Sequence, residues 1–319
     1  MQLYIPNNLK VYYIINLAFF CWLTIFSDLV YGQSSTVYIW DGAPPNSITN
    51  SSYRQKISYY TDGLVKSIGQ ISDPKIEIFL PDSDSNGIGV LIFPGGGYKY
   101  VAIKKEGYDV AKALNKMGYT AFVLSYRLPS NDIMHDKSIG PLMDAQEAVR
   151  LIKSKLDEYN IQLNKLGVLG FSAGGHLAAS LHAKYNEYLY KSKYETTARP
   201  DFSVLIYPVI SMNDEIAHEG SKHSLLGVNS TKLQEDNFSI ELNTNTDVSP
   251  VFLVHASDDS SVSVQNSLRY YNSLNRKGVP VALHIYQNGG HGFGLGNNTE
   301  NKRWLYDLDA WIESQFLNN

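Results

Sequence analysis

The feature that most restricts the fold of this chain is a short glycine–serine motif between an apolar run and a helix-like segment. Ser172 lies at its centre, after the apolar residues 166–169 and before the helix-compatible stretch 173–183. Where a strand turns directly into a helix, side chains two positions before and after the central residue collide with backbone, which explains Gly170 and Gly174. The motif therefore predicts a strand–turn–helix unit that presents the Ser172 hydroxyl as a candidate nucleophile.

Short apolar runs alternate with helix-period segments over most of the chain. Seven runs are expected to be strands: 76–80, 90–93, 121–124, 166–169, 202–207, 251–254 and 281–286. Besides the helix after Ser172, apolar stripes predict four more helices, at 110–117, 141–156, 264–277 and 304–312. Strands that alternate with helices indicate the α/β class, with a mainly parallel central sheet and helices on both faces.

The length of the chain suits one large domain. It has 319 residues, of which 44% are hydrophobic and 18% charged, and we expect a single α/β domain over residues 33–319. Residues 211–247 are rich in Asn, Ser and acidic side chains and are too long for a simple connection, so a small lid insertion is expected there. Residues 33–73 are polar and irregular, and are expected to form an extended segment that wraps around the core.

Residues 1–32 differ in composition from the rest and resemble a secretory signal peptide. Their mostly apolar stretch, 11–26, is shorter than the roughly 20 residues that a transmembrane helix needs. Gly32 supplies a small residue for cleavage before Gln33. The only cysteine, Cys21, lies in this segment, so a cleaved chain would form no disulfide. We expect a secreted or periplasmic protein without stable membrane association, and an uncleaved anchor is the alternative.

The charge pattern argues against several classes of ligand. The net charge is −4 and no block of Lys or Arg occurs, so the sequence offers no footprint for nucleic acid or an anionic membrane. His218 and His223 lie five positions apart without carboxylates at metal-ligand spacing, so no metal site is expected. The expected substrate is neutral or polymeric, and no cofactor is expected.

Two further loops carry the residue types that would activate a serine. A hydroxyl becomes a good nucleophile when a neutral imidazole takes its proton, and that imidazole needs a carboxylate on its second nitrogen. Asp258 and Asp259 follow the strand predicted at 251–254, and His291 follows the next predicted strand. The order serine, aspartate, histidine, each in a loop after a strand, predicts the triad of a hydrolase.

Acyl transfer also requires hydrogen-bond donors for the oxyanion that develops on the substrate carbonyl, each worth roughly 3 kcal/mol. One donor is expected to be the backbone N–H of Ala173, directly after the serine. The others are expected from Gly96 and Gly97, in the glycine-rich segment 94–98 that follows a predicted strand. Because these glycines have no side chains, their N–H groups can face the substrate.

Six segments together resemble the secreted, acetylxylan esterase-like group of the α/β-hydrolase fold. They are P-G-G-G-Y at 94–98, L-S-Y-R-L at 124–128, P-L-M-D-A at 141–145, and the segments 170–176, 254–259 and 289–292. The resemblance extends from Trp40 to the last predicted helix. It implies a carbohydrate esterase that deacetylates plant-type polysaccharides, with Ser172 as nucleophile and His291 as base.

The resemblance also bears on the third member of the triad. In the motif of this group, the catalytic aspartate lies three positions before a valine. Asp259 has this spacing to Val262, whereas Asp258 does not, so Asp259 is the expected residue. The group commonly has proline after the valine, and Ser263 stands there in this chain.

Four other polar side chains have less direct assignments. Tyr98 and Asp144 would either line the substrate pocket or brace the oxyanion loop, and Tyr98 is the expected substrate contact. His176 is expected to pack behind the serine turn, since a second base near the nucleophile has no task in this mechanism. His255, at the end of a predicted strand, is expected to be structural.

Three other functions compete with deacetylation. A feruloyl esterase would differ only in the size of its acyl pocket. A peptidase resembling the prolyl oligopeptidase group would share the D-D-x-x-V stretch of 258–262, but that group usually carries a large propeller domain, for which 319 residues are too few. A non-catalytic polysaccharide-binding module on the same scaffold is disfavoured because every residue type of the triad is present.

Overall fold

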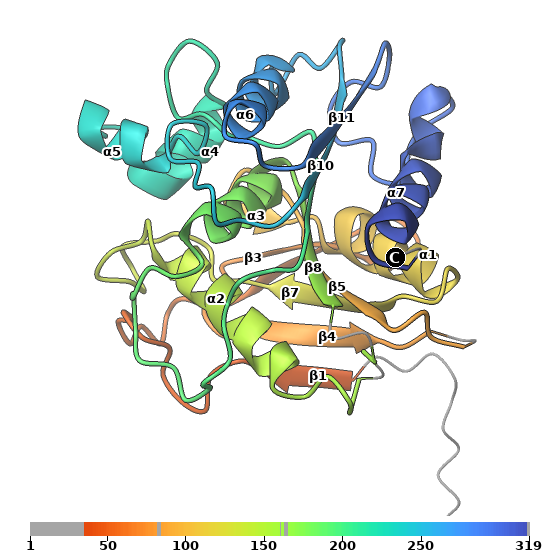
Figure 1. Ribbon diagram of the computed structural model, residues 1–319. Coiled ribbons are helices and arrows are strands. Elements are labelled where there is room, and N and C mark those ends of the chain that lie inside the picture. Colours follow the sequence, from red (N-terminus) through yellow and green to blue (C-terminus); the bar gives the residue numbers. More distant parts are fainter. Residues whose placement is uncertain (1–34, 82–83, 160, 163–164, 318–319) are drawn as a thin grey trace, which may run out of the picture. The chain divides into compact units, whose positions relative to one another are not determined.

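An eight-stranded sheet forms the centre of the computed structural model, which describes residues 35–81, 84–159, 161–162 and 165–317 (Figure 1). Its strands are β1 (Ser35–Tyr38), β4 (Lys75–Phe79), β5 (Ile88–Phe93), β7 (Thr120–Ser125), β8 (Lys165–Phe171), β9 (Ser203–Ile206), β10 (Val251–Ala256) and β11 (Val281–Tyr286). They are ordered β1-β4-β7-β5-β8-β9-β10-β11. Every neighbouring pair from β7 to β11 is parallel, whereas β4 is antiparallel to both β1 and β7. The predicted mainly parallel sheet is confirmed, and so are its seven predicted strands.

Helices cover both faces of this sheet, as predicted (Figure 1). On one face lie α1 (Asp109–Asn115) and α7 (Trp304–Ile312), and on the other lie α2 (Gly140–Lys153), α3 (Ser172–Lys184) and α6 (Gln265–Arg276). Strands β5 and β7 are buried along their whole length, as expected for parallel strands that pack against helices on two sides.

The segment 33–73 differs from its prediction because it contains strands. Strand β1 joins the edge of the main sheet, and β2 (Lys56–Tyr59) pairs with β3 (Val65–Gly69). Strand β3 also pairs with β6 (Tyr100–Val101), which completes a separate three-stranded antiparallel sheet. Strands β1, β2 and β3 have four or five residues each, too few for a periodic pattern to stand out in a polar segment.

The long connection between β9 and β10 contains two short helices within the insertion predicted at 211–247. They are α4 (Glu219–Leu226) and α5 (Lys232–Phe238). The side chain of His218 caps α4, and Thr231 starts α5 with a capping box.

The signal peptide predicted at 1–32 lies outside the residues that the structure describes. In the described ranges, no helix is both long enough and apolar enough to cross a membrane.

Candidate active site

The turn at Ser172 has the strained geometry that its sequence predicts. Ser172 is the first residue of α3, directly after β8, and its φ of +50° lies in the left-handed region. A Cβ atom on Gly174 would overlap the carbonyl group of Phe93, and one on Gly170 would overlap the backbone of Gly174. The turn therefore excludes side chains at both glycine positions and holds Ser172 at the carboxyl end of a central strand.

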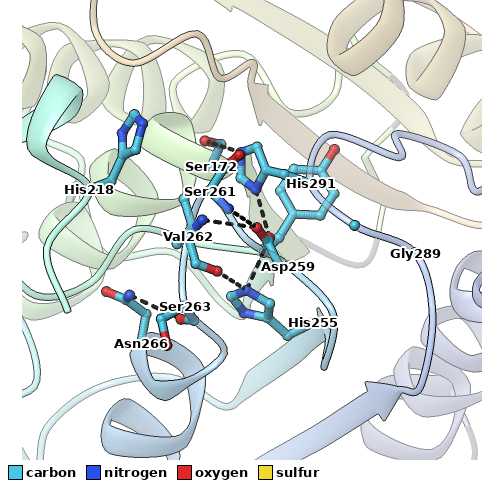
Figure 2. Close-up of polar contacts among 12 residues, drawn as sticks. Ser172, His218, His255, Asp259, Ser261, Val262, Ser263, Asn266, Gly289 and His291 are labelled. Carbon is cyan, nitrogen blue, oxygen red and sulfur yellow. Dashed lines mark hydrogen bonds and ion pairs between the residues drawn. The ribbon is translucent and has the colours of Figure 1, made fainter.

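Ser172 at the start of α3 and the loop residues His291 and Asp259 form one hydrogen-bonded line (Figure 2). Oγ of Ser172 lies 2.8 Å from Nε2 of His291, and Nδ1 of His291 lies 2.7 Å from Oδ2 of Asp259. Because a carboxylate can only accept, the proton of the neutral imidazole is on Nδ1, and Nε2 accepts from the serine hydroxyl. His291 is thus oriented to act as a general base toward Ser172.

Asp259 is surrounded by hydrogen-bond donors. Its Oδ1 accepts the N–H groups of Ser261 and Val262, each at 2.9 Å, and its Oδ2 also lies 3.3 Å from Nε2 of His255. Burial by itself would raise the pKa of this carboxyl, but the hydrogen bonds from His255 and His291 outweigh burial and hold the pKa well below its ordinary value. Asp259 is therefore ionised at neutral pH.

Asp258, the alternative third member, holds the histidine loop rather than the imidazole. Its side chain is exposed, and its Oδ1 accepts the N–H of Gly290 at 2.7 Å. Ser263, which stands where proline is common, accepts the N–H of Asn266 on its carbonyl oxygen at 2.9 Å and so leads into α6. The loop around Asp259 thus reaches α6 without that proline.

The glycine-rich loop after β5 leaves two amides without an acceptor. Gly96 and Gly97 have φ values of +135° and +63°, and neither N–H donates a hydrogen bond to another described residue. The N–H of Gly95 is already used, because it donates to Glu106 at 2.8 Å. The N–H of Ala173 belongs to the first turn of α3, where amides have no partner within the helix. These three free amides are the ones that the sequence predicts as oxyanion donors.

Tyr126 braces this loop, and a buried ion pair holds the residue that follows Tyr126. The hydroxyl of Tyr126 donates to the carbonyl oxygen of Pro94 at 2.7 Å. The next residue, Arg127, binds Asp144 through Nε and Nη2, and Trp40 donates to the same carboxylate. Asp144 is fully buried, and its carboxylate holds Arg127 and Trp40.

Tyr98 also lies inside the protein, although the sequence suggests a substrate contact. It is 2% exposed, and its hydroxyl lies 2.9 Å from Nδ1 of His176, whose Nε2 donates to the carbonyl oxygen of Phe238. Burial lowers the pKa of His176 to about 4, so this ring stays neutral and accepts the proton of Tyr98. The pair links the glycine-rich loop to the end of α5.

His218 lies beside the same loop, close to Gly97. Its Nδ1 accepts the N–H of Ser221, and its Cε1 would lie 3.7 Å from a Cβ on Gly97. Burial lowers the pKa of His218, and the proximity of His291 lowers it further. Within the described residues, no group of three His, Cys, Asp or Glu side chains could hold a metal ion.

Two buried residues next to the triad were not predicted from the sequence. Glu106, in the π-helical turn Ile103–Tyr108, accepts the N–H of Gly95, and Tyr207, directly after β9, packs its ring on His291. The sequence held a signal for Glu106, because its spacing places it on the apolar stripe of Ile103 and the following helix. A carboxylate on such a stripe is usually partnered when it is buried.

Comparison with known proteins relates this chain to esterases. Residues 76–274 match the family model described as BD-FAE. The chain is 35% identical over 241 residues to an acetylxylan esterase of Xylanibacter ruminicola, covering 74% of this chain and 47% of that protein. It is 32% identical over 250 residues to endo-1,4-β-xylanase B of Butyrivibrio fibrisolvens, covering 76% of this chain and 39% of that protein. The chain thus spans less than half the length of these two relatives.

A solved structure matches over almost its full length. The acetyl ester-xyloside bifunctional hydrolase from Caldicellulosiruptor lactoaceticus has 35% sequence identity to this chain and a TM-score of 0.74. The match covers 88% of this chain and 96% of that one. The α/β-hydrolase fold predicted from the sequence is confirmed.

Proposed function

Because this chain belongs to the BD-FAE family of α/β-hydrolase esterases, we propose that it removes acetyl groups from plant-type polysaccharides through an acyl-Ser172 intermediate. The observation that carries this proposal is the line from Ser172 through His291 to Asp259, with hydrogen bonds of 2.8 and 2.7 Å. Each residue has the hydrogen-bond partner that its role in acyl transfer requires.

In the proposed mechanism, His291 takes the proton of Ser172 as the oxygen attacks the acetyl carbonyl. The N–H groups of Ala173, Gly96 and Gly97 stabilise the resulting oxyanion, each by roughly 3 kcal/mol. The imidazolium then gives its proton to the sugar hydroxyl that leaves, and Asp259 stabilises the positive charge while it exists. Water, activated by the same histidine, releases acetate from Ser172.

The substrate class is supported by two relatives whose names include acetylxylan esterase and acetyl ester-xyloside hydrolase. The net charge of −4 fits a neutral carbohydrate better than a polyanion. Secretion rests on the composition of residues 1–32 and is tested by sequencing the N-terminus of the exported protein, where we expect Gln33.

The function is tested by supplying the protein with acetylated xylan, acetylated mannan and feruloylated arabinoxylan and measuring released acetate and ferulate. We expect acetate from an acetylated polymer and little ferulate. Faster release of ferulate would replace this proposal with feruloyl ester cleavage. On activated esters we expect acetyl groups to be removed much faster than octanoyl groups, and equal rates would contradict a small acyl site.

A further inference from the structure

The carboxylate of Glu106 is buried between the glycine-rich loop and the histidine loop. The residue is 5% exposed, and both of its oxygens accept hydrogen bonds. Oε2 accepts the N–H of Gly95 at 2.8 Å, and Oε1 accepts the hydroxyl of Tyr207 at 2.9 Å. A Cβ on Gly95 would lie 2.9 Å from the Cβ of Ser172, so the amide that Glu106 holds is close to the candidate nucleophile.

Tyr207 extends this contact to the histidine loop. Its hydroxyl oxygen accepts the N–H of Gly294 at 3.0 Å. The ring lies edge-on against His291, with centroids 4.9 Å apart, and against Phe293, with centroids 4.5 Å apart. Tyr207 has a φ of +37°, a backbone conformation that a bulky residue rarely adopts. Such strain persists only where surrounding contacts over-determine it, and it is common at functional sites.

Together these contacts join the glycine-rich loop and the histidine loop. The proposed mechanism requires these two loops to keep a fixed position relative to each other. Gly95 directly precedes Gly96, a predicted oxyanion donor, and Gly294 lies three positions after His291. The π-helical turn that carries Glu106 is a rare backbone form found frequently at functional sites. No step of the proposed mechanism uses either Glu106 or Tyr207.

We propose, on the basis of the esterase function above, that Glu106 and Tyr207 are positioning residues that fix the oxyanion loop and the His291 ring in one geometry. Glu106 in addition places a negative charge beside His291, and this charge favours the imidazolium that forms when Ser172 attacks.

The hydrogen bonds indicate that Glu106 is ionised when it holds the two loops. Gly95 and Tyr207 both donate to the carboxylate, and the tyrosine oxygen accepts from Gly294, so every group is satisfied when Glu106 is ionised. Burial raises the pKa of Glu106 above its ordinary value, and these donors and the nearby His291 offset burial only in part. The other titratable groups that face the carboxylate are Lys105 on its own turn and Tyr126 after β7.

The test uses the near-isosteric variants Glu106→Gln and Tyr207→Phe, alone and together. The matched control is Tyr119→Phe, because Tyr119 is another buried tyrosine whose hydroxyl donates to a carboxylate, that of Asp309 at 2.6 Å. Tyr119 directly precedes β7, whereas Tyr126 directly follows it, so Tyr119 lies at the other end of the strand. Three quantities are measured for each protein: kcat and KM on an activated acetyl ester from about pH 5 to about pH 9, the labelling rate of Ser172 by a fluorophosphonate, and Tm.

We expect each single variant to lower kcat about 10- to 100-fold with less than about a threefold change in KM, because the ground-state contacts remain. The double variant should lose little more than the worse single variant, since both break the same connection. In the pH profile of kcat, the loss of activity at acid pH should move to lower pH in Glu106→Gln but not in Tyr207→Phe. The reason is that only Glu106→Gln removes the anion beside His291. Tyr119→Phe should lower Tm without any of these effects.

Wild-type kcat in either single variant would overturn the inference, as would losses that multiply in the double variant. The same conclusion would follow if Tyr119→Phe lost as much activity as the others. If Glu106→Gln does not fold, the labelling rate of Tyr207→Phe decides, with the same 10- to 100-fold loss expected. Labelling needs no carbohydrate, so a wild-type protein that is labelled but deacetylates no polysaccharide would contradict the proposed substrate and not this inference.

Discussion

Asp259 and His291 are joined by a hydrogen bond of 2.7 Å, and the adjacent Asp258 takes no part in it. The two neighbouring carboxylates therefore differ in task. One is buried against an imidazole and two backbone amides, whereas the other is exposed and holds one glycine amide. Spacing in the sequence favoured Asp259, and the geometry gives a physical reason for that choice.

The first prediction compares these two residues. Asp259→Asn should lower kcat about 10³- to 10⁴-fold, because an amide can hold His291 in the wrong tautomer and gives no charge to the imidazolium. Asp258→Asn should lower kcat less than about tenfold, since its oxygen can still accept from Gly290. Steady-state kinetics on an acetyl ester decides, and a larger loss in Asp258→Asn would reverse the assignment.

A second pair of variants tests the glycine-rich loop. A Cβ on Gly96 would overlap the carbonyl of Tyr100, so Gly96→Ala must move the loop and should lower kcat about 10²- to 10³-fold, as if one oxyanion donor were lost. A Cβ on Gly97 would have Cε1 of His218 as its nearest neighbour, at 3.7 Å, so Gly97→Ala causes no overlap. Its cost is the strain of an alanine at the positive φ of this position, about 1 kcal/mol. A wild-type kcat in Gly96→Ala would argue against a role of this loop in binding the oxyanion.

Tyr98 gives a third prediction, because two roles were open for it in the sequence. The buried bond to His176 indicates a bracing role, so Tyr98→Phe should lower the free energy of unfolding by about 1 kcal/mol and leave KM within about twofold. A rise of KM by tenfold with unchanged stability would instead support the substrate contact. Urea unfolding and kinetics on an acetylated oligosaccharide distinguish the two.

The fourth prediction concerns pH and His182, which lies away from the triad. This side chain is 1% exposed, and burial lowers its pKa from 6.5 to about 4. The unfolded chain therefore binds a proton at a higher pH than the folded protein, and stability falls as the pH drops from about 6.5 to about 4. The contribution is at most about 1.4 kcal/mol per pH unit. His176 contributes in the same direction.

The variant His182→Gln isolates this effect, because glutamine does not titrate and can still contact Tyr270 and Ser249. The free energy of unfolding, measured with urea at several pH values, should fall less steeply in the variant than in the wild type. Equal slopes would show that His182 does not contribute.

Most of the fold could be predicted from the sequence, because the central strands are continuous apolar runs and the helices carry clear apolar stripes. The short strands β1, β2 and β3 could not be predicted, because sheet pairing rather than local pattern defines them. All residues of strand β2 are exposed, so burial does not restrict which residue types occur in it.

The candidate site could be predicted where chemistry restricts the residue type, as at Ser172, His291 and the glycines of the oxyanion loop. The supporting residues Glu106 and Tyr207 were missed because their partners come from distant segments. The bond between them joins residues 101 positions apart, and no local pattern records such a pairing. Only the position of Glu106 on an apolar stripe hinted at a buried partner.

The central claim is tested most directly by mass spectrometry of the protein quenched in acid during turnover of an acetyl ester. The account predicts an acetyl group on the peptide that contains Ser172, with neither this adduct nor acetate release in Ser172→Ala. Acetate release by Ser172→Ala at the wild-type rate, without a covalent acetyl group on the wild-type peptide, would contradict it.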